Sequence, residues 1–155
     1  MIFPTLLALH SLVRWLVLIS LIFILFTSIF GLSSKQPFTQ KHNWLRMIAV
    51  SIAHLQLILG IWLYSISPLI QYFWQNFGEA VHERFPRFFG MEHSLVMTIA
   101  VVLITIGSAK AKRKTTDLEK HKTLLIWMGI ALFLILTSIP WSFSPLTSRP
   151  LFRSF

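Results

Sequence analysis

Four long apolar stretches separated by short polar segments dominate the pattern of this chain. A helix needs about 20 mostly apolar residues to cross the hydrocarbon core of a bilayer. Stretches that approach or exceed this length occupy residues 5–32, 44–66, 89–109 and 123–141. Nearly all the other residues are needed to connect them. The pattern therefore predicts an all-α fold, an integral membrane four-helix up-down bundle that forms one domain over residues 1–155.

Two of the connections carry local signals of their own. The longest connection lies between the second and third stretches, and its segment LIQYFWQNF (69–77) is aromatic and amphipathic. Such a segment favours a short interfacial helix between spans 2 and 3. In the last connection, Thr116 is followed three residues later by Glu119, which is typical of the start of a helix.

Composition supports the membrane interpretation. Of the 155 residues, 55% are hydrophobic and only 12% are charged, and the mean hydropathy is +0.70. A soluble domain of this size needs more polar cover. The first stretch lacks a basic start, is too long for the apolar core of a signal peptide and contains Arg14, so we expect a retained span. The chain has no cysteine, which excludes disulfides, thiolate metal sites and cysteine nucleophiles.

The net charge of +9 is unevenly distributed. Nine basic residues flank the first and third connections: Lys35, Lys41, Arg46, Lys110, Lys112, Arg113, Lys114, Lys120 and Lys122. The other side carries Arg14, Arg84, Arg87, Arg149 and Arg153, partly balanced by Glu79, Glu83 and Glu92. The positive-inside rule predicts that the first group faces the cytoplasm of a bacterial inner membrane and that both termini are periplasmic. Contact with the lipid bilayer explains the basic charge, so we expect no nucleic-acid partner.

The tetrapeptide HSLV occurs twice, at His10–Val13 and His93–Val96, and each copy opens an apolar run. Internal duplication and chance both remain open as explanations. At about 1.5 Å of rise per residue, His10 lies roughly 7 Å and His93 about 5 Å inside the outer ends of their helices. The two imidazoles are therefore expected to lie at nearly the same depth.

Of the six histidines, His42 and His82 fall in connections and are expected to be solvated, which leaves one on each span. Two level imidazoles in a bundle predict the axial ligands of one b-type haem, here His10 and His93. Arg14 follows His10 by one helical turn, so its guanidinium could pair with a haem propionate. The competing interpretation makes the histidines interfacial side chains without a ligand and lets Arg14 extend to the headgroups.

His54 lies near the middle of its span, where a polar side chain needs a partner. Three roles are open: a hydrogen bond to a neighbouring helix, contact with a quinone oxygen, or ligation of a second haem together with His121. The predicted depths of His54 and His121 differ by about 10–15 Å. The sequence therefore favours one haem over two.

Several stretches together resemble a family of small bacterial four-span membrane proteins catalogued as cytochrome B. They are HSLVRW (10–15), HLQLILGIWLY (54–64), RFFGMEHSLVMTIAVVLITIGSAKAKR (87–113), IPW (139–141) and RPLF (149–152). The resemblance covers all four helices and implies a haem b protein of the inner membrane that transfers electrons. By matching position it carries over His10, Arg14, His54 and His93.

The leading functional prediction is an electron-transfer protein rather than a stand-alone enzyme, with a quinol or a periplasmic electron carrier as its partner. The alternative from another class is an accessory transmembrane subunit that has no cofactor of its own and packs against other membrane subunits or a second copy of the chain. A quinone- or metal-handling membrane enzyme using His54 with His93 or Glu92 is a third interpretation. Hydrolytic motifs are absent from the sequence.

Overall fold

The computed structural model describes residues 2–143 and 147. Its long helices are α1 (Ile2–Ser33), α2 (Gln40–Ile66), α6 (His93–Arg113) and α7 (Asp117–Ser138). Shorter helices α3 (Pro68–Gln75), α4 (Phe77–Ala80) and α5 (Arg84–Arg87) connect α2 to α6. Within these residues, four helical segments are long and apolar enough to cross a membrane, and the third of them runs without a break from Arg84 to Arg113. The predicted all-α four-helix membrane bundle is confirmed.

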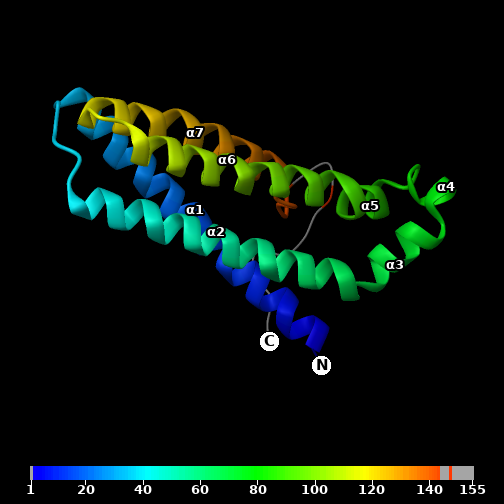
Figure 1. Ribbon diagram of the computed structural model, residues 1–155. Coiled ribbons are helices and arrows are strands. Elements are labelled where there is room, and N and C mark those ends of the chain that lie inside the picture. Colours follow the sequence, from blue (N-terminus) through cyan, green and yellow to red (C-terminus); the bar gives the residue numbers. More distant parts are fainter. Residues whose placement is uncertain (1, 144–146, 148–155) are drawn as a thin grey trace.

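The four long helices form a closed bundle in which consecutive spans run in opposite directions (Figure 1). α1 packs against α2 and α7, and α6 packs against the same two helices. The connections 34–39 and 114–116 lie at one end of the bundle, which we call the loop end (Figure 1). The helices α3 to α5 lie at the opposite end, which we call the cap end. The short helix predicted over residues 69–77 is therefore present as α3, and it is followed by the two shorter helices α4 and α5.

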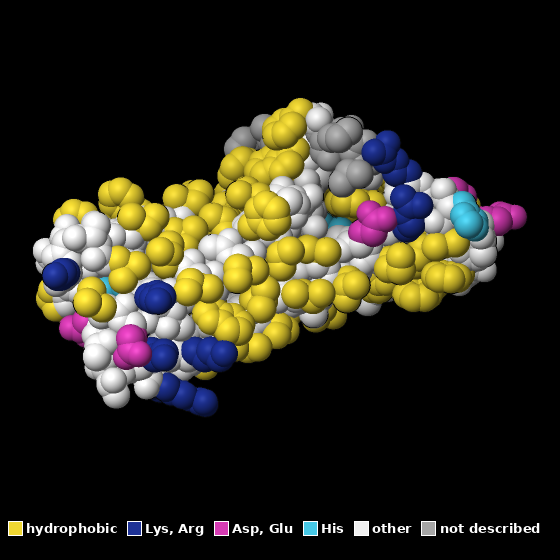
Figure 2. Space-filling model, turned by 90° about the horizontal axis from the view of Figure 1, so that it is seen from above, with side chains coloured by type: hydrophobic (Ala, Val, Ile, Leu, Met, Phe, Trp, Pro, Cys, Tyr) yellow, Lys and Arg dark blue, Asp and Glu magenta, His cyan; other side chains and the backbone are white. Residues whose placement is uncertain are grey.

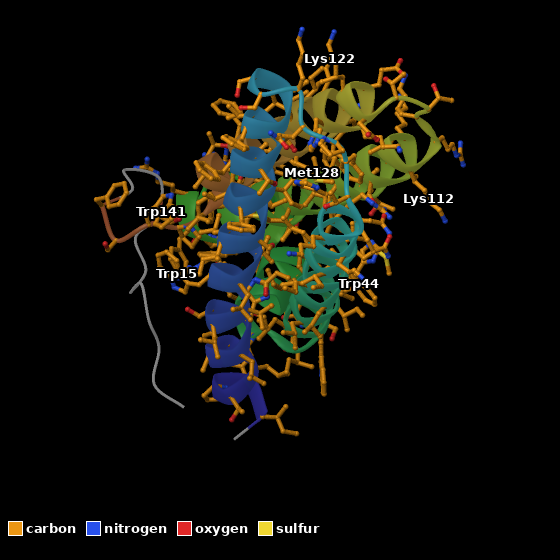
Figure 3. All side chains as sticks on the ribbon, turned by 90° about the vertical axis from the view of Figure 1, so that its left-hand side faces the viewer. Trp15, Trp44, Lys112, Lys122, Met128 and Trp141 are labelled. Carbon is orange, nitrogen blue, oxygen red and sulfur yellow. The ribbon has the colours of Figure 1, made fainter. Side chains whose placement is uncertain are left out.

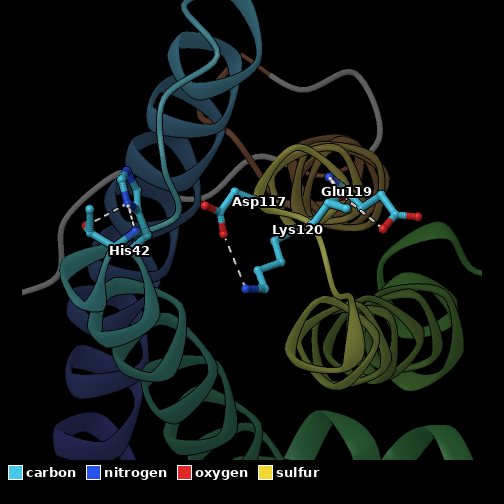
Figure 4. Close-up of polar contacts among 6 residues, drawn as sticks. His42, Asp117, Glu119 and Lys120 are labelled. Atoms are coloured by element: carbon cyan, nitrogen blue, oxygen red, sulfur yellow. Dashed lines mark hydrogen bonds and ion pairs between the residues drawn. The ribbon is translucent and has the colours of Figure 1, made fainter.

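The helices extend beyond the apolar stretches at most ends, because polar caps rather than hydropathy decide where a helix begins. α7 begins at Asp117 instead of 123, since the Thr116 hydroxyl accepts the Glu119 N–H at 3.3 Å. At the start of α2, His42 Nδ1 accepts the Thr39 N–H at 3.1 Å. Figure 4 shows these loop-end contacts together with the ion pair of Lys120 and Asp117.

The fourth span, α7, ends at Ser138, three residues before the predicted end at Trp141. Pro140 explains the difference, because a proline disfavours helical backbone in the residue that precedes it. Ile139 accordingly adopts an extended conformation, with φ −72° and ψ 131°.

On the face shown in Figure 2, large apolar side chains cover the middle and charged side chains gather towards the two ends. On α1 the outward row includes Ile19, Phe23, Phe26 and Phe30, each more than half exposed. Such a belt between charged ends is what contact with a lipid bilayer requires. Lys112 and Lys122 project outward at the loop end in Figure 3. Arg149 and Arg153, which the sequence places at the other end, lie outside the described residues.

The best-packed part of the core contains Leu21 and Ile24 of α1, Ile104 of α6 and Met128 of α7, none of them more than 1% exposed. Met128 lies among the helices in Figure 3. Nearby, the buried guanidinium of Arg46 on α2 donates to Ser108 of α6 and, at 2.6 Å, to Asn43 Oδ1. This arginine therefore ties α2 to α6 through neutral acceptors.

The helices α6 and α7 lie very close together at Gly107 of α6, where an added methyl group would overlap Trp127 Cβ of α7. Because Cβ moves only with its backbone, we expect Gly107→Ala to separate α6 from α7 and to cost about 1–3 kcal/mol of stability. Thermal unfolding in detergent measures this cost. Gly129→Ala is the matched control, since its new methyl group would meet only Leu25 at 3.9 Å. Equal midpoints for the two variants would contradict the close packing.

Candidate cofactor-binding site

A cavity of about 680 Å³ lies within the cap-end half of the bundle, between α1, α2, α6 and the end of α7. Its size falls in the range of about 300–1,000 Å³ that is typical of small-molecule sites. Most of its wall is apolar. The polar side chains that line it are His10, Ser11 and Arg14 of α1, Gln56 and Tyr64 of α2, Ser67 before α3, and His93, Ser94 and Thr98 of α6. The structure therefore brings His10, Arg14 and His93 to one cavity.

His93 follows a single π-helical turn, Phe88–Glu92, that joins α5 to α6. Its Nδ1 lies 2.8 Å from the carbonyl oxygen of Ser138 on α7. A carbonyl only accepts, so Nδ1 carries the proton and the neutral ring keeps Nε2 as a free electron-pair donor. The rings of Phe88 and Phe89 lie 5.7 and 5.9 Å from the imidazole. His93 is thus held in one tautomer and one orientation.

His10 approaches α2 at Gly60, where an added Cβ would lie 3.3 Å from the imidazole Cε1. A larger residue at position 60 would therefore push the ring away from α2. The Gln56 side-chain amide donates to the His10 backbone carbonyl at 3.0 Å, which adds a second link between the two helices. Among the described residues, His10 Nδ1 has no hydrogen-bond partner although it is buried.

Arg14 lies one turn after His10 and lines the same cavity. Its Nη2 donates to Ser11 Oγ at 3.4 Å, and its guanidinium lies 5.4 Å from the centre of the Trp15 ring. Trp15 in turn meets the edge of Trp141 at 6.1 Å, and both rings appear on the same side of the bundle in Figure 3. The cavity wall therefore carries a positive charge able to bind a carboxylate.

At the cap end, α2 and α3 contact the π-helical turn beside the cavity. The Tyr64 hydroxyl donates to the Gly90 carbonyl at 2.7 Å, and Trp74 Nε1 donates to the same hydroxyl at 3.0 Å. Phe73, which is fully buried, packs directly on Gly90. Glu92, next to His93, forms an ion pair of 2.8 Å with Arg87. The Glu92 carboxylate is therefore paired with Arg87.

His54 and His121 lie in different places. His54 Nε2 is 2.9 Å from Thr105 Oγ1, so the mid-span imidazole has a partner on α6. His121 is fully buried at the loop end, where its ring lies 5.0 Å from that of His42. His42 and His54 are 12 positions apart on α2, about 18 Å at 1.5 Å per residue. The structure does not bring His54 and His121 together for a shared cofactor.

One loop-end detail differs from the expectations. His42 was expected to be solvated, but it is half-buried because its ring packs on Phe38 and His121. The His121 ring also packs against Gly31, where an added Cβ would lie 2.5 Å from the ring. His82, by contrast, is exposed as expected.

Sequence reasoning missed Gln56, Gly60, Tyr64 and the Ser138 carbonyl. Gln56 left a usable signal, since an amide inside an apolar span needs a polar partner. The other three left none, because a backbone carbonyl, a glycine contact and a tyrosine near a helix end become informative only when the helices are placed.

No protein-family model, curated protein or solved structure matches this chain. The resemblance to the cytochrome B family therefore remains a prediction.

The chemistry of the donor set fits a haem. A bis-histidine haem takes two imidazoles from the protein, an apolar pocket and a cation for its carboxylates. The cavity presents His10, His93 and Arg14 within an apolar wall. A mononuclear zinc site takes three or more protein ligands. Among the described residues no group of three histidine, cysteine or acidic side chains is placed to hold a metal ion.

Proposed function

We propose that this chain is a membrane b-type cytochrome that carries electrons through one haem held between His10 and His93. The observation that carries the proposal is that two imidazoles from different spans line one apolar cavity together with an arginine. When bound, haem b supplies reversible one-electron redox chemistry. The apolar wall would limit contact with water, and His10 and His93 would hold the haem iron.

Each residue has a separate task in this proposal. His93 offers Nε2, because its Nδ1 proton is committed to Ser138. His10 offers a second imidazole from α1, at the point where Gly60 lets it lie against α2. Arg14 would hold a propionate, which offsets the cost of placing its charge within a span. His54, with Thr105 as its partner, is not needed for ligation.

The spectrum of the purified protein tests this function. After expression with haem supply and purification in mild detergent, we expect a sharp α-band of b-type haem in the reduced-minus-oxidised spectrum, at about one haem per chain. A folded protein that stays colourless after reconstitution with haem would contradict the proposal and favour the accessory transmembrane subunit.

We further propose that the loop end faces the cytoplasm of a bacterial inner membrane, with both termini and the haem near the periplasmic face. The excess of basic residues around connections 34–39 and 114–116 supports this orientation. A cofactor near the periplasmic face suits exchange with a quinol or a periplasmic electron carrier.

The orientation can be measured directly because the chain has no cysteine of its own. His82→Cys and Lys112→Cys place single thiols on exposed positions at the cap end and the loop end. We expect a membrane-impermeant maleimide to label His82→Cys in intact spheroplasts and Lys112→Cys only after permeabilisation. The reverse pattern would contradict the proposed orientation.

A further inference from the structure

Two buried polar atoms on neighbouring helices lack hydrogen-bond partners among the described residues: His10 Nδ1 on α1 and Gln56 Oε1 on α2. One is able to donate and the other only accepts. Both residues line the cavity. Buried polar groups are normally paired, so two complementary atoms left open at one site point to a contact that forms when the site is filled.

The backbone already holds the two residues together. Gln56 Nε2 donates to the His10 carbonyl at 3.0 Å, which fixes the amide beside residue 10. Gly60 lies one turn further along α2, on the same face as Gln56. A Cβ added at Gly60 would lie 3.8 Å from His10 Nδ1, so this nitrogen lies close to the face of α2 that carries Gln56.

We infer that Gln56 is the positioning residue for His10: its Oε1 would accept the Nδ1 proton and leave Nε2 to hold the haem iron. This inference rests on the proposed haem function. Binding of the haem iron at Nε2 would make the Nδ1–H a stronger donor and would favour a hydrogen bond to Gln56 Oε1. A ligating histidine commonly has such an outer-shell acceptor, and that partner fixes the tautomer and raises the basicity of the ligand.

The arrangement mirrors the one at His93, where the Ser138 carbonyl accepts the Nδ1 proton at 2.8 Å. Both imidazoles would then carry their proton on Nδ1 and direct Nε2 to the cofactor. The two acceptors differ in kind. Ser138 acts through its backbone, whereas Gln56 acts through a side chain that substitution can remove, weaken or strengthen.

Three substitutions of Gln56 separate a positioning role from a structural one. Gln56→Met keeps the size but removes the acceptor, and Gln56→Asn keeps the amide but shortens its reach. For both we expect haem affinity to fall about 10- to 100-fold and the midpoint potential to rise, because a less basic imidazole stabilises the oxidised iron less. Gln56→Glu keeps an acceptor, so we expect it to retain haem and to lower the potential.

The measurements are haem dissociation in detergent, redox titration, and the g-values of the ferric low-spin signal, which report axial imidazole basicity. Gln71→Met is the matched control, since Gln71 lies exposed on α3 outside the cavity. If Gln56→Met does not fold, Gln56→Asn and Gln56→Glu still provide opposite expected shifts.

The possible failures are distinguishable. Wild-type protein that binds no haem overturns the proposed function and this inference together. Wild-type protein with a normal α-band, combined with unchanged potentials and g-values in all three variants, overturns only the role of Gln56. Shifts of the same sign in Gln56→Glu and Gln56→Met also overturn it, because they would reflect general disturbance of the site.

Discussion

Replacement of either His10 or His93 by alanine is expected to abolish stable haem binding. Each substitution removes one of the two imidazoles that line the cavity, and among the described residues no other histidine lines it. His54 is committed to Thr105, and His121 lies at the other end of the bundle. The loss should therefore exceed the roughly 10- to 100-fold that removal of an outer-shell partner costs.

The ratio of haem to protein after purification, together with the reduced-minus-oxidised spectrum, measures this loss. His82→Ala is the control for surface histidine, since His82 is exposed at the cap end. His54→Ala tests the mid-span imidazole and should retain the α-band. A full complement of low-spin haem in His10→Ala or His93→Ala would refute the assignment of that ligand. Loss of haem in His54→Ala alone would move the site towards the middle of the bundle.

The second large effect is expected from Gly90→Ala, in the π-helical turn before His93. An added Cβ would lie 2.5 Å from both Cγ and Cδ1 of Phe73. Phe73 has little room to yield, because it is fully buried and its ring packs edge-on to Trp74 and Phe77 at 5.2 and 5.4 Å. We expect a cost of about 1–3 kcal/mol in stability. Haem affinity should fall as well, since the same turn positions His93.

Thermal unfolding and haem titration of Gly90→Ala, compared with Gly78→Ala, measure the two effects. Gly78 lies in the neighbouring helix α4, and a Cβ added there meets nothing within 4 Å. An unfolding midpoint for Gly90→Ala equal to that of Gly78→Ala would show that Phe73 does not confine the turn. Lower stability with unchanged haem affinity would show that the packing at the cap end does not determine the position of His93.

The architecture could be predicted from the sequence because a lipid bilayer imposes a simple requirement on every span. A span must be apolar over about 20 residues and must satisfy its own backbone, so the four spans stand out in the hydrophobic pattern. The exact ends of the helices do not stand out in this pattern. Polar residues such as Gln40 and Asp117 look like connecting residues by hydropathy, although they lie inside the helices. The short helices α4 and α5 contain four residues each, which is too few to produce a recognisable helical periodicity of apolar residues.

The candidate site could likewise be predicted from the sequence only in part. Depth along a helix follows from residue number, so the sequence placed His10 and His93 at one level, and the structure gives them one cavity. Orientation around the helix axis and contact between helices do not follow from one sequence. For that reason the Thr105 partner of His54, the burial of His121 and the position of Gln56 beside His10 emerged only from the fold.

The stop in α7 has a consequence for the chemistry of α6. A helix leaves its last carbonyls without internal donors. Because Pro140 prevents the final turn from continuing, the Ser138 carbonyl is released from the backbone ladder and becomes available to His93. One proline near the end of the chain therefore selects the protonation site of an imidazole 45 residues earlier. Extending the last span by a turn would withdraw that acceptor without altering any side chain in the cavity.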